Sequence, residues 1–161
     1  MASDYISEHF KASEFVVTNT GLPNILPDDL IVNRDLLCTQ LQVLRDFIGK
    51  PIIINSAFRS PAVNKAVGGA THSAHLECRA ADIRCPGLSY NDFLCSILNS
   101  PAAFSRIILE PFWFHVEIDY GNHDLFNELR RVELPDSSGF PGSFTVYYLL
   151  NTRTMINLSK R

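Results

Sequence analysis

The sequence predicts an α+β fold in which helices flank a mainly antiparallel sheet. Helical spacing of apolar residues prevails in the first part of the chain, and alternating patterns prevail from residue 104 onward. The chain has 161 residues, of which 46% are hydrophobic and 19% are charged. This size and apolar content fit one domain with a hydrophobic core, so we expect a single domain over residues 1–161.

Two segments carry the helical pattern. Between Asp28 and Ile48, apolar residues recur at steps of three, four and seven, and Gly49 stands just past the end as a stop signal. These apolar residues are Leu30, Leu37, Leu41, Leu44 and Ile48. A second helix is expected after the N-cap Ser89, ending before Pro101. Its inward residues would be Phe93, Leu94, Ile97 and Leu98.

Five segments are expected to be strands. Residues 51–55 form a short β-branched run typical of a buried strand, and residues 80–83 are expected to be the strand after the loop that carries His75. Residues 144–150 form a late strand after a Ser/Gly/Pro-rich loop over 136–143. Residues 106–110 can pair with residues 112–119 across Pro111. In the segment 112–119, Phe112, Phe114, Val116 and Ile118 share the core face, whereas Trp113, His115, Glu117 and Asp119 share the opposite face.

Charge and composition exclude several classes of protein. The net charge is -3 and no long run of Lys or Arg occurs, which argues against a dedicated nucleic-acid binder. No apolar stretch approaches 18 residues, and the N-terminus lacks the pattern of a signal peptide, so we expect no stable membrane insertion and synthesis in a cytoplasm. The four cysteines, Cys38, Cys78, Cys85 and Cys95, form no CxxC pair and are expected to be buried thiols.

Histidines and carboxylates cluster in sequence in the central part of the chain. His72, His75 and His115 lie near Glu77, Asp82, Glu110 and Glu117. A catalytic zinc ion takes three protein ligands of these types, and because no HExxH signature occurs, any such site must combine separate segments. The six residues between His75 and Asp82 suit a loop leading into the strand 80–83, although this spacing alone is also typical of surface residues.

Four ordered motifs over about residues 51–118 resemble the zinc D-alanyl-D-alanine carboxypeptidases and related murein peptidases. Residues 73–82 (SAHLECRAAD) resemble the family's SxHxxGxAxD motif, and residues 110–115 (EPFWFH) resemble its motif of a glutamate, a tryptophan and a final histidine. Residues 56–60 (SAFRS) and 64–69 (NKAVGG) resemble its SG[FY]RS and LNxAVGG segments. Residues 7–15 (SEHFKASEF) are similar to the start of small-phage, endolysin-type members.

The resemblance implies a role for each matching residue. His75, Asp82 and His115 would bind Zn²⁺, and Glu110 would act as the general base. Arg59 would donate to the scissile carbonyl oxygen. Substrate contacts would come from Ser73, which could also be a turn cap, from Trp113, and from His72, which is read as a second-sphere or substrate-lining residue.

Two departures from the family pattern leave questions open. Cys78 stands where the motif has glycine, and a positive φ there would strain it; its thiol could also reach the metal, although a small buried residue is the simpler interpretation. The interval from Glu110 to His115 is short, which leaves Glu117 as an alternative base, although Glu117 is expected to point beside the ligand.

The resemblance thus implies a zinc metallopeptidase that hydrolyses a peptide bond in the peptide stems of bacterial peptidoglycan, as a D,D-carboxypeptidase or an endopeptidase of the phage lysis type. Its site of action would be the cell wall or periplasm. The alternative is a zinc-containing wall-binding or virion module of the same fold without catalysis. The sequence leaves open which murein bond is cut, how the protein reaches the wall and its oligomeric state.

Overall fold

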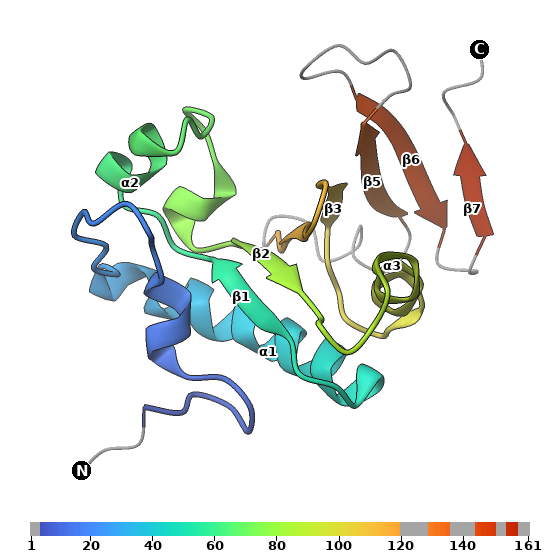
Figure 1. Cartoon of the computed structure of the whole chain (residues 1–161), viewed down its shortest axis with the longest axis horizontal. Helices are drawn as coiled ribbons and strands as arrows, with labels where there is room; N and C mark the ends of the chain where they lie inside the picture. The colour runs from blue at the N-terminus through green and yellow to red at the C-terminus, as the bar shows by residue number, and fades with distance from the viewer. Residues whose placement is uncertain (1–3, 120–128, 136–143, 151–153, 158–161) are drawn as a thin grey trace.

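A computed structural model describes residues 4–119, 129–135, 144–150 and 154–157. Within these residues, seven strands form one sheet in the order β1-β2-β4-β3-β5-β6-β7 (Figure 1). The strands are β1 (Ile53–Ser56), β2 (Ala80–Arg84), β3 (Arg106–Leu109), β4 (Phe114–Glu117), β5 (Leu129–Pro135), β6 (Phe144–Leu150) and β7 (Thr154–Asn157). The pair β3 and β5 is parallel and every other neighbouring pair is antiparallel, so the predicted mainly antiparallel α+β fold is confirmed.

The helices begin and end at recognisable signals. The helix α1 (Ile31–Ile48) ends at Gly49, whose φ of 68° is the left-handed conformation that glycine adopts without strain. The helix α3 (Tyr90–Asn99) has the predicted N-cap, because the Ser89 hydroxyl accepts a hydrogen bond from the Asp92 backbone N–H. The short α2 (Pro61–Ala66) starts after Ser60 in the same way. Three 3₁₀ turns complete the set: η1 (Ala12–Val16), η2 (Asp28–Leu30) and η3 (Ala74–Glu77).

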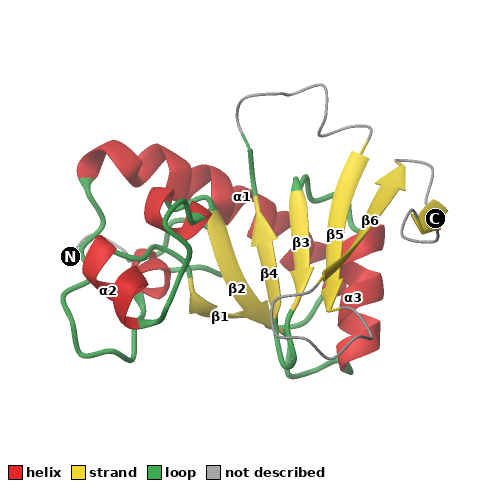
Figure 2. Cartoon of the chain, turned by 90° about the horizontal axis from the view of Figure 1, so that it is seen from above, coloured by secondary structure: helices red, strands yellow, loops and turns green. Residues whose placement is uncertain are grey.

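The core lies between the sheet and the helices α1 and α3, which cover one face of the sheet (Figure 2). Period-two alternation sends one set of strand residues into this core and the other set to the opposite face. The core set includes Ile83 of β2, Ile107 of β3 and Phe114 and Val116 of β4. The opposite face of β2 and β4 carries Asp82, His115 and Glu117, so the predicted division of the β4 segment is confirmed for residues 114–118.

Several predicted boundaries need correction. Phe112 is 82% exposed and belongs to the turn before β4, because the chain must reverse direction between Glu110 and Trp113. The first strand begins at Ile53, two residues later than predicted, and the segment 28–48 opens with the 3₁₀ turn η2 before α1. The late strand 144–150 is present as β6, whereas the predicted loop 136–143 lies outside the described residues.

All four cysteines are free thiols. Cys38, Cys78 and Cys85 are buried, as predicted, but Cys95 is exposed. Cys95 lies on α3 between the inward-facing Phe93 and Ile97, and the helical rotation of 100° per residue places it on the outer side.

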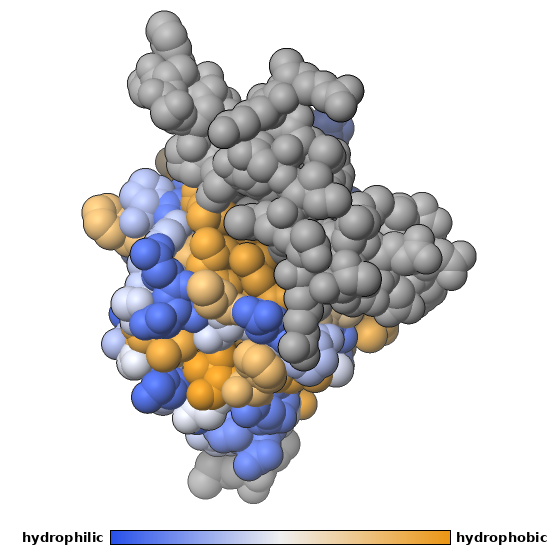
Figure 3. Space-filling view, turned by 90° about the vertical axis from the view of Figure 1, so that its right-hand side faces the viewer, coloured by the Kyte–Doolittle hydropathy of each residue, from blue (hydrophilic) through white to orange (hydrophobic). Residues whose placement is uncertain are grey.

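The described part of the surface mixes polar and apolar residues. On the side of the molecule shown in Figure 3, hydrophobic residues (orange) gather in the middle and hydrophilic residues (blue) border them. Among the described residues, no helix has both the length and the apolar character that crossing a membrane requires.

Candidate metal centre

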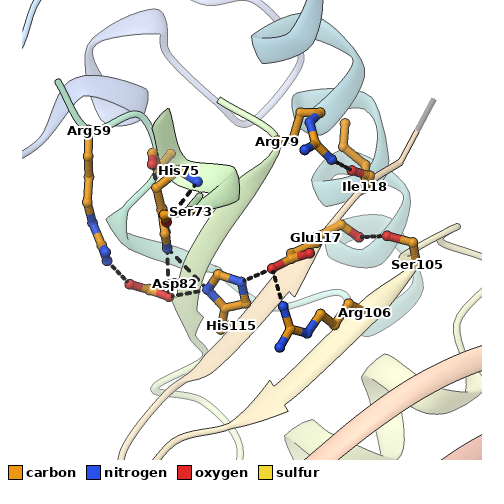
Figure 4. A network of polar contacts seen from close by, with 11 residues as sticks. Arg59, Ser73, His75, Arg79, Asp82, Ser105, Arg106, His115, Glu117 and Ile118 are labelled. Carbon is orange, nitrogen blue, oxygen red and sulfur yellow. Dashed lines mark hydrogen bonds and ion pairs between the residues drawn. The ribbon is translucent and has the colours of Figure 1, made fainter. Parts of the chain in front are cut away.

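Three potential ligands converge on the open face of the sheet. His75, Asp82 and His115 are buried, and one ligand atom from each lies within 4.8 Å of the other two. The Asp82 Oδ1 atom is 3.3 Å from His75 Nε2 and 3.0 Å from His115 Nδ1, and the two ring nitrogens are 3.1 Å apart (Figure 4). The structure therefore brings together all three residues predicted as metal ligands.

Strand pairing places two of these residues side by side. β2 and β4 are antiparallel neighbours, and Asp82 is the direct partner of His115 in their register. Side chains of directly opposed residues project from the same face about 5 Å apart. A shift of the register by one residue would turn one of the two side chains toward the core. The apolar core residues of both strands oppose such a shift.

The third residue comes from the turn that precedes β2. The Ser73 hydroxyl accepts a hydrogen bond from the His75 backbone N–H and caps η3. The turn ends at Cys78, which has a φ of 52° and is the one non-glycine residue with positive φ among the described residues. The left-handed conformation of Cys78 changes the chain direction between η3 and β2, so that His75 faces the strand β2. The anticipated positive φ at the position of the motif glycine is thus observed.

A backbone carbonyl fixes the tautomer of His75. The His75 Nδ1 atom lies 2.6 Å from the carbonyl oxygen of Ala57. Because a carbonyl oxygen only accepts hydrogen bonds, Nδ1 must carry the proton and Nε2 presents its lone pair to Asp82 and His115. Burial lowers the pKa of His75 more than the neighbouring Asp82 raises it, which favours the neutral ring that metal binding requires.

A carboxylate holds the outer side of the His115 ring. The His115 Nε2 atom lies 2.7 Å from Glu117 Oε1, and the Arg106 Nη1 atom lies 3.3 Å from the same oxygen. Burial opposes protonation of His115, but the hydrogen bonds to Asp82 and Glu117 outweigh it and raise the pKa of His115 to about 9. This pKa describes a ring placed between two carboxylates in the protein without a metal.

Asp82 is ionised and is held by a guanidinium group. Its burial favours the neutral acid, but the hydrogen bond from His115 and the contact with His75 outweigh this effect and lower the pKa of Asp82. The Arg59 Nη2 group donates to Asp82 Oδ2, and the Arg59 Nε–H donates to the Ser56 hydroxyl over 2.9 Å. Arg59, predicted to act on the substrate carbonyl, therefore lies directly beside the ligand group (Figure 4).

Hydrogen bonds to Asn24 hold the segment that carries Arg59 in place. The Asn24 amide donates to the carbonyl oxygens of Val16 and Phe58, and its Oδ1 atom accepts from the Ser60 backbone N–H over 2.7 Å. The Arg59 backbone N–H donates to the His75 carbonyl over 3.0 Å. These bonds hold residues 57–60, and with them both the Ala57 carbonyl and the guanidinium group of Arg59.

Glu110 lies where β3 leaves the sheet toward β4. Ile108 is the direct partner of His115, so the alternation along the chain carries Glu110 to the face of His115. The Tyr90 hydroxyl donates to the Glu110 carbonyl over 2.6 Å, and the Glu110 backbone N–H donates to the Trp113 carbonyl over 3.1 Å. Burial and the negative charge of Asp82 raise the pKa of the Glu110 carboxyl group, and the charge of His115 acts in the opposite direction.

The residues predicted to contact substrate occupy different settings. Ser73 is the cap of η3, so the alternative role of a turn cap is present, while its contact with substrate stays a prediction. His72 is exposed in the turn before η3, and Trp113 is half-buried immediately before β4. Cys78 lies in the hydrophobic core, burial raises its pKa to about 12, and it is not part of the ligand group.

Four residues that hold the site were not singled out from the sequence: Asn24, Ser56, Ala57 and Arg106. Ala57 acts through its backbone carbonyl, which leaves no side-chain signal. The contact of Arg106 with Glu117 could have been predicted, because pairing of residues 106–110 with the following strand across the Pro111 turn places Arg106 opposite Glu117.

The donor set fits a zinc ion. The outer ring nitrogens of His75 and His115 both donate hydrogen bonds, which leaves their inner nitrogens and Asp82 Oδ1 as the three atoms that can bind a metal. Without a metal, protonated His115 supplies positive charge between these atoms, and a zinc ion can take the place of its inner proton. Two imidazoles with one carboxylate are the ligands of many catalytic zinc sites. Each histidine also has the outer hydrogen-bond partner that metal-bound imidazoles usually have.

Comparison with known proteins agrees with this geometry. A stretch of 45 residues is 47% identical to the zinc D-Ala-D-Ala carboxypeptidase of Streptomyces albus G, and it covers 27% of this chain and 18% of that protein. The chain therefore spans less than a fifth of the length of this curated relative. The family model of peptidase M15 matches residues 8–115, which include all three ligand residues, Arg59 and Glu110. The chain belongs to the peptidase M15 family.

Proposed function

We propose that this protein is a zinc metallopeptidase that hydrolyses a peptide bond in the peptide stems of bacterial peptidoglycan. The observation that carries the proposal is the convergence of His75 Nε2, Asp82 Oδ1 and His115 Nδ1 beside Arg59. The similarity to a zinc D-Ala-D-Ala carboxypeptidase supports the choice of metal and of substrate class. The similarity of residues 7–15 to small-phage members of the family supports a role in phage lysis. The protein would then act as a D,D-carboxypeptidase or endopeptidase at the cell wall or in the periplasm.

His75, Asp82 and His115 would hold the zinc ion. When bound by three protein ligands, zinc supplies Lewis-acid chemistry: it polarises a carbonyl group and makes water more acidic. The two neutral imidazoles and one carboxylate leave the ion a net positive charge, which favours this chemistry.

Glu110 is the general base in this proposal. A base works best when its pKa lies near the working pH, and the raised pKa of Glu110 moves this carboxyl group in that direction. Glu110 would accept a proton from water and later deliver it to the leaving amine. Tyr90 and Trp113 hold the backbone of Glu110 on the face that carries His115.

Arg59 would stabilise negative charge on the carbonyl oxygen of the substrate. Its guanidinium group is permanently charged and carries five N–H donors, so it can donate to a substrate oxygen while it keeps its bonds to Ser56 and Asp82. His72 and Ser73 closely precede His75, Trp113 closely precedes His115, and these three residues would contact the rest of the peptide stem.

The test is digestion of purified murein followed by mass spectrometry of the new termini, with and without a chelator. We expect new amino and carboxyl termini that depend on zinc, and their masses identify the bond. The variant Glu110→Gln is the matched control, because it keeps the size of the side chain and removes its basicity. Wild-type protein that holds zinc and produces no new termini would contradict the proposal and favour a zinc-containing wall-binding or virion module.

A further inference from the structure

The His115 ring lies between two carboxylates that have different surroundings (Figure 4). On the inner side, Asp82 Oδ1 is 3.0 Å from His115 Nδ1, and Asp82 belongs to the ligand group. On the outer side, Glu117 Oε1 is 2.7 Å from His115 Nε2, and Glu117 does not belong to that group. A carboxylate accepts hydrogen bonds, so Glu117 keeps a proton on Nε2, and Nδ1 is then the nitrogen that would give up its proton to bind a metal beside Asp82.

The Glu117 carboxylate is itself held in place. Glu117 lies directly opposite Arg106 in the pairing of β3 with β4, and the Arg106 Nη1 group contacts Glu117 Oε1 over 3.3 Å. The Glu117 carbonyl accepts hydrogen bonds from the backbone N–H and the hydroxyl group of Ser105. The Glu117 side chain is only 15% exposed, so few other positions are open to it.

The two histidines differ in what fixes their tautomer. His75 depends on the Ala57 carbonyl, which is part of the backbone and survives any side-chain substitution. His115 depends on the Glu117 side chain, which a substitution can remove. Without this acceptor the proton of a neutral imidazole can reside on either nitrogen, and a proton on Nδ1 would block the metal position.

We propose that Glu117, held by Arg106, is a positioning residue that presents His115 Nδ1 to the metal. The inference rests on the proposed zinc site and concerns how that site is built. Glu117 Oε1 already accepts from His115 and faces Arg106, so Glu117 orients a ligand instead of taking the proton from water. Outer carboxylates of this kind usually contribute about 10- to 100-fold to metal affinity.

The test measures zinc affinity by competition with a chromogenic chelator, together with the ¹⁵N resonances of His115 in the zinc-loaded protein. In the wild type we expect a proton on Nε2 and the metal at Nδ1. Glu117→Ala should weaken zinc binding by about 10- to 100-fold. Glu117→Gln keeps an acceptor oxygen but loses the charge, so it should keep Nδ1 ligation with a smaller loss, about 3- to 10-fold.

Glu77→Gln is a matched control. Glu77 follows the ligand His75 by two residues, as Glu117 follows His115, and it also pairs with an arginine, Arg79, but it is exposed and touches no ligand ring. We expect its zinc affinity to equal that of the wild type. Melting temperatures of all variants show whether each one folds, and if Glu117→Ala does not fold, Glu117→Gln decides.

Zinc affinity and His115 resonances that are unchanged in the folded Glu117 variants would overturn the inference. A loss of turnover in Glu117→Ala at full zinc occupancy and unchanged affinity would also overturn it, because that result would make Glu117 the base. Wild-type protein that binds zinc but cleaves no murein would refute the proposed peptidase activity alone, since the affinity and tautomer measurements do not depend on turnover.

Discussion

Asp82 and His115 are directly opposed residues on the antiparallel strands β2 and β4, and Asp82 Oδ1 lies 3.0 Å from His115 Nδ1. The two residues are 33 positions apart in the chain, so strand register, and not local sequence, determines their contact. The buried neighbours Ile83, Phe114 and Val116 hold that register from the core side. Two members of the ligand group are thus placed by the pairing of β2 with β4, and η3 adds His75.

The first prediction is that the folded protein binds about one zinc ion per chain, as a site with three protein ligands implies. His115→Ala should remove most of the affinity, because only two ligands remain. Elemental analysis and titration with zinc measure both quantities. His9→Ala is the control: His9 lies in an exposed group with Glu8 and Asp46, and its loss should leave the stoichiometry unchanged. Folded, metal-free protein that does not take up added zinc would refute the site.

The second prediction separates the two candidate bases. Glu110→Ala should leave zinc bound and lower turnover by on the order of a hundredfold or more, because a general base is lost. Glu117→Ala should lower turnover much less once zinc is saturating, because Glu117 acts through His115. Steady-state kinetics on murein fragments, with zinc occupancy measured in each sample, provide the comparison. The reverse ranking at equal metal content would assign the base to Glu117.

The third prediction concerns Asn24, which makes two hydrogen bonds to the backbone on either side of Arg59, at Phe58 and Ser60, and a third to the Val16 carbonyl. Asn24→Ala leaves two carbonyl groups and one N–H group without these partners and should lower the free energy of unfolding by about 1–3 kcal/mol. Urea denaturation measures this change. Asn99→Ala is the control, because the exposed Asn99 makes a single bond to the Cys95 carbonyl within α3. Equal losses in the two variants would show that Asn24 does not hold the segment.

The fourth prediction is that one thiol reacts rapidly in the native protein. Cys95 is exposed, whereas Cys38, Cys78 and Cys85 are buried. Burial also raises the pKa of Cys38, despite its bond to Ser7, and raises that of Cys78 to about 12, so neither forms a thiolate at pH 8. Titration with a disulfide reagent should detect about one fast thiol, and all four after unfolding. Cys95→Ser should abolish the fast reaction; a fast reaction that persists would place another thiol at the surface.

The helix ends were predictable because local chemistry encodes them, whereas His75, Asp82 and His115 were predicted as ligands from the resemblance of their motifs to the murein peptidases. Ser89 and Gly49 marked helix ends through capping, and alternation along residues 114–118 separated His115 and Glu117 from the core. The same alternation made the predicted strand 112–119 too long, since nothing in the pattern distinguishes the exposed Phe112 of the turn from a core residue.

What the sequence did not reveal depends on contacts between distant segments. The pairing of β2 with β4 and the reach of Asn24 to Phe58 and Ser60 follow from tertiary packing. The Ala57 carbonyl that orients His75 is present in every residue type, so no residue pattern points to it. The six-residue helix α2 is too short to show a helical period, although Ser60 and Pro61 form a usable start signal.

The last prediction concerns the strained position of Cys78. Its φ of 52° and ψ of 35° are left-handed, which costs a non-glycine residue about 1–2 kcal/mol. The packing of its fully buried side chain offsets this cost, since removing the side chain would leave a small cavity in the core. Cys78→Gly should therefore change the free energy of unfolding by less than about 1 kcal/mol, because release of strain and loss of packing act in opposite directions.

The variant Cys78→Ala separates these two contributions, because alanine loses the thiol but keeps the strained φ. In an ordinary helix interior glycine is less stable than alanine by about 0.5–1 kcal/mol, and at a left-handed position the order reverses. We therefore expect Cys78→Gly to be at least as stable as Cys78→Ala in thermal and urea unfolding, and both variants to bind zinc as the wild type does. A more stable alanine variant would contradict the strain at Cys78. A large loss of zinc affinity in both folded variants would make the thiol a fourth ligand, because both lack sulfur.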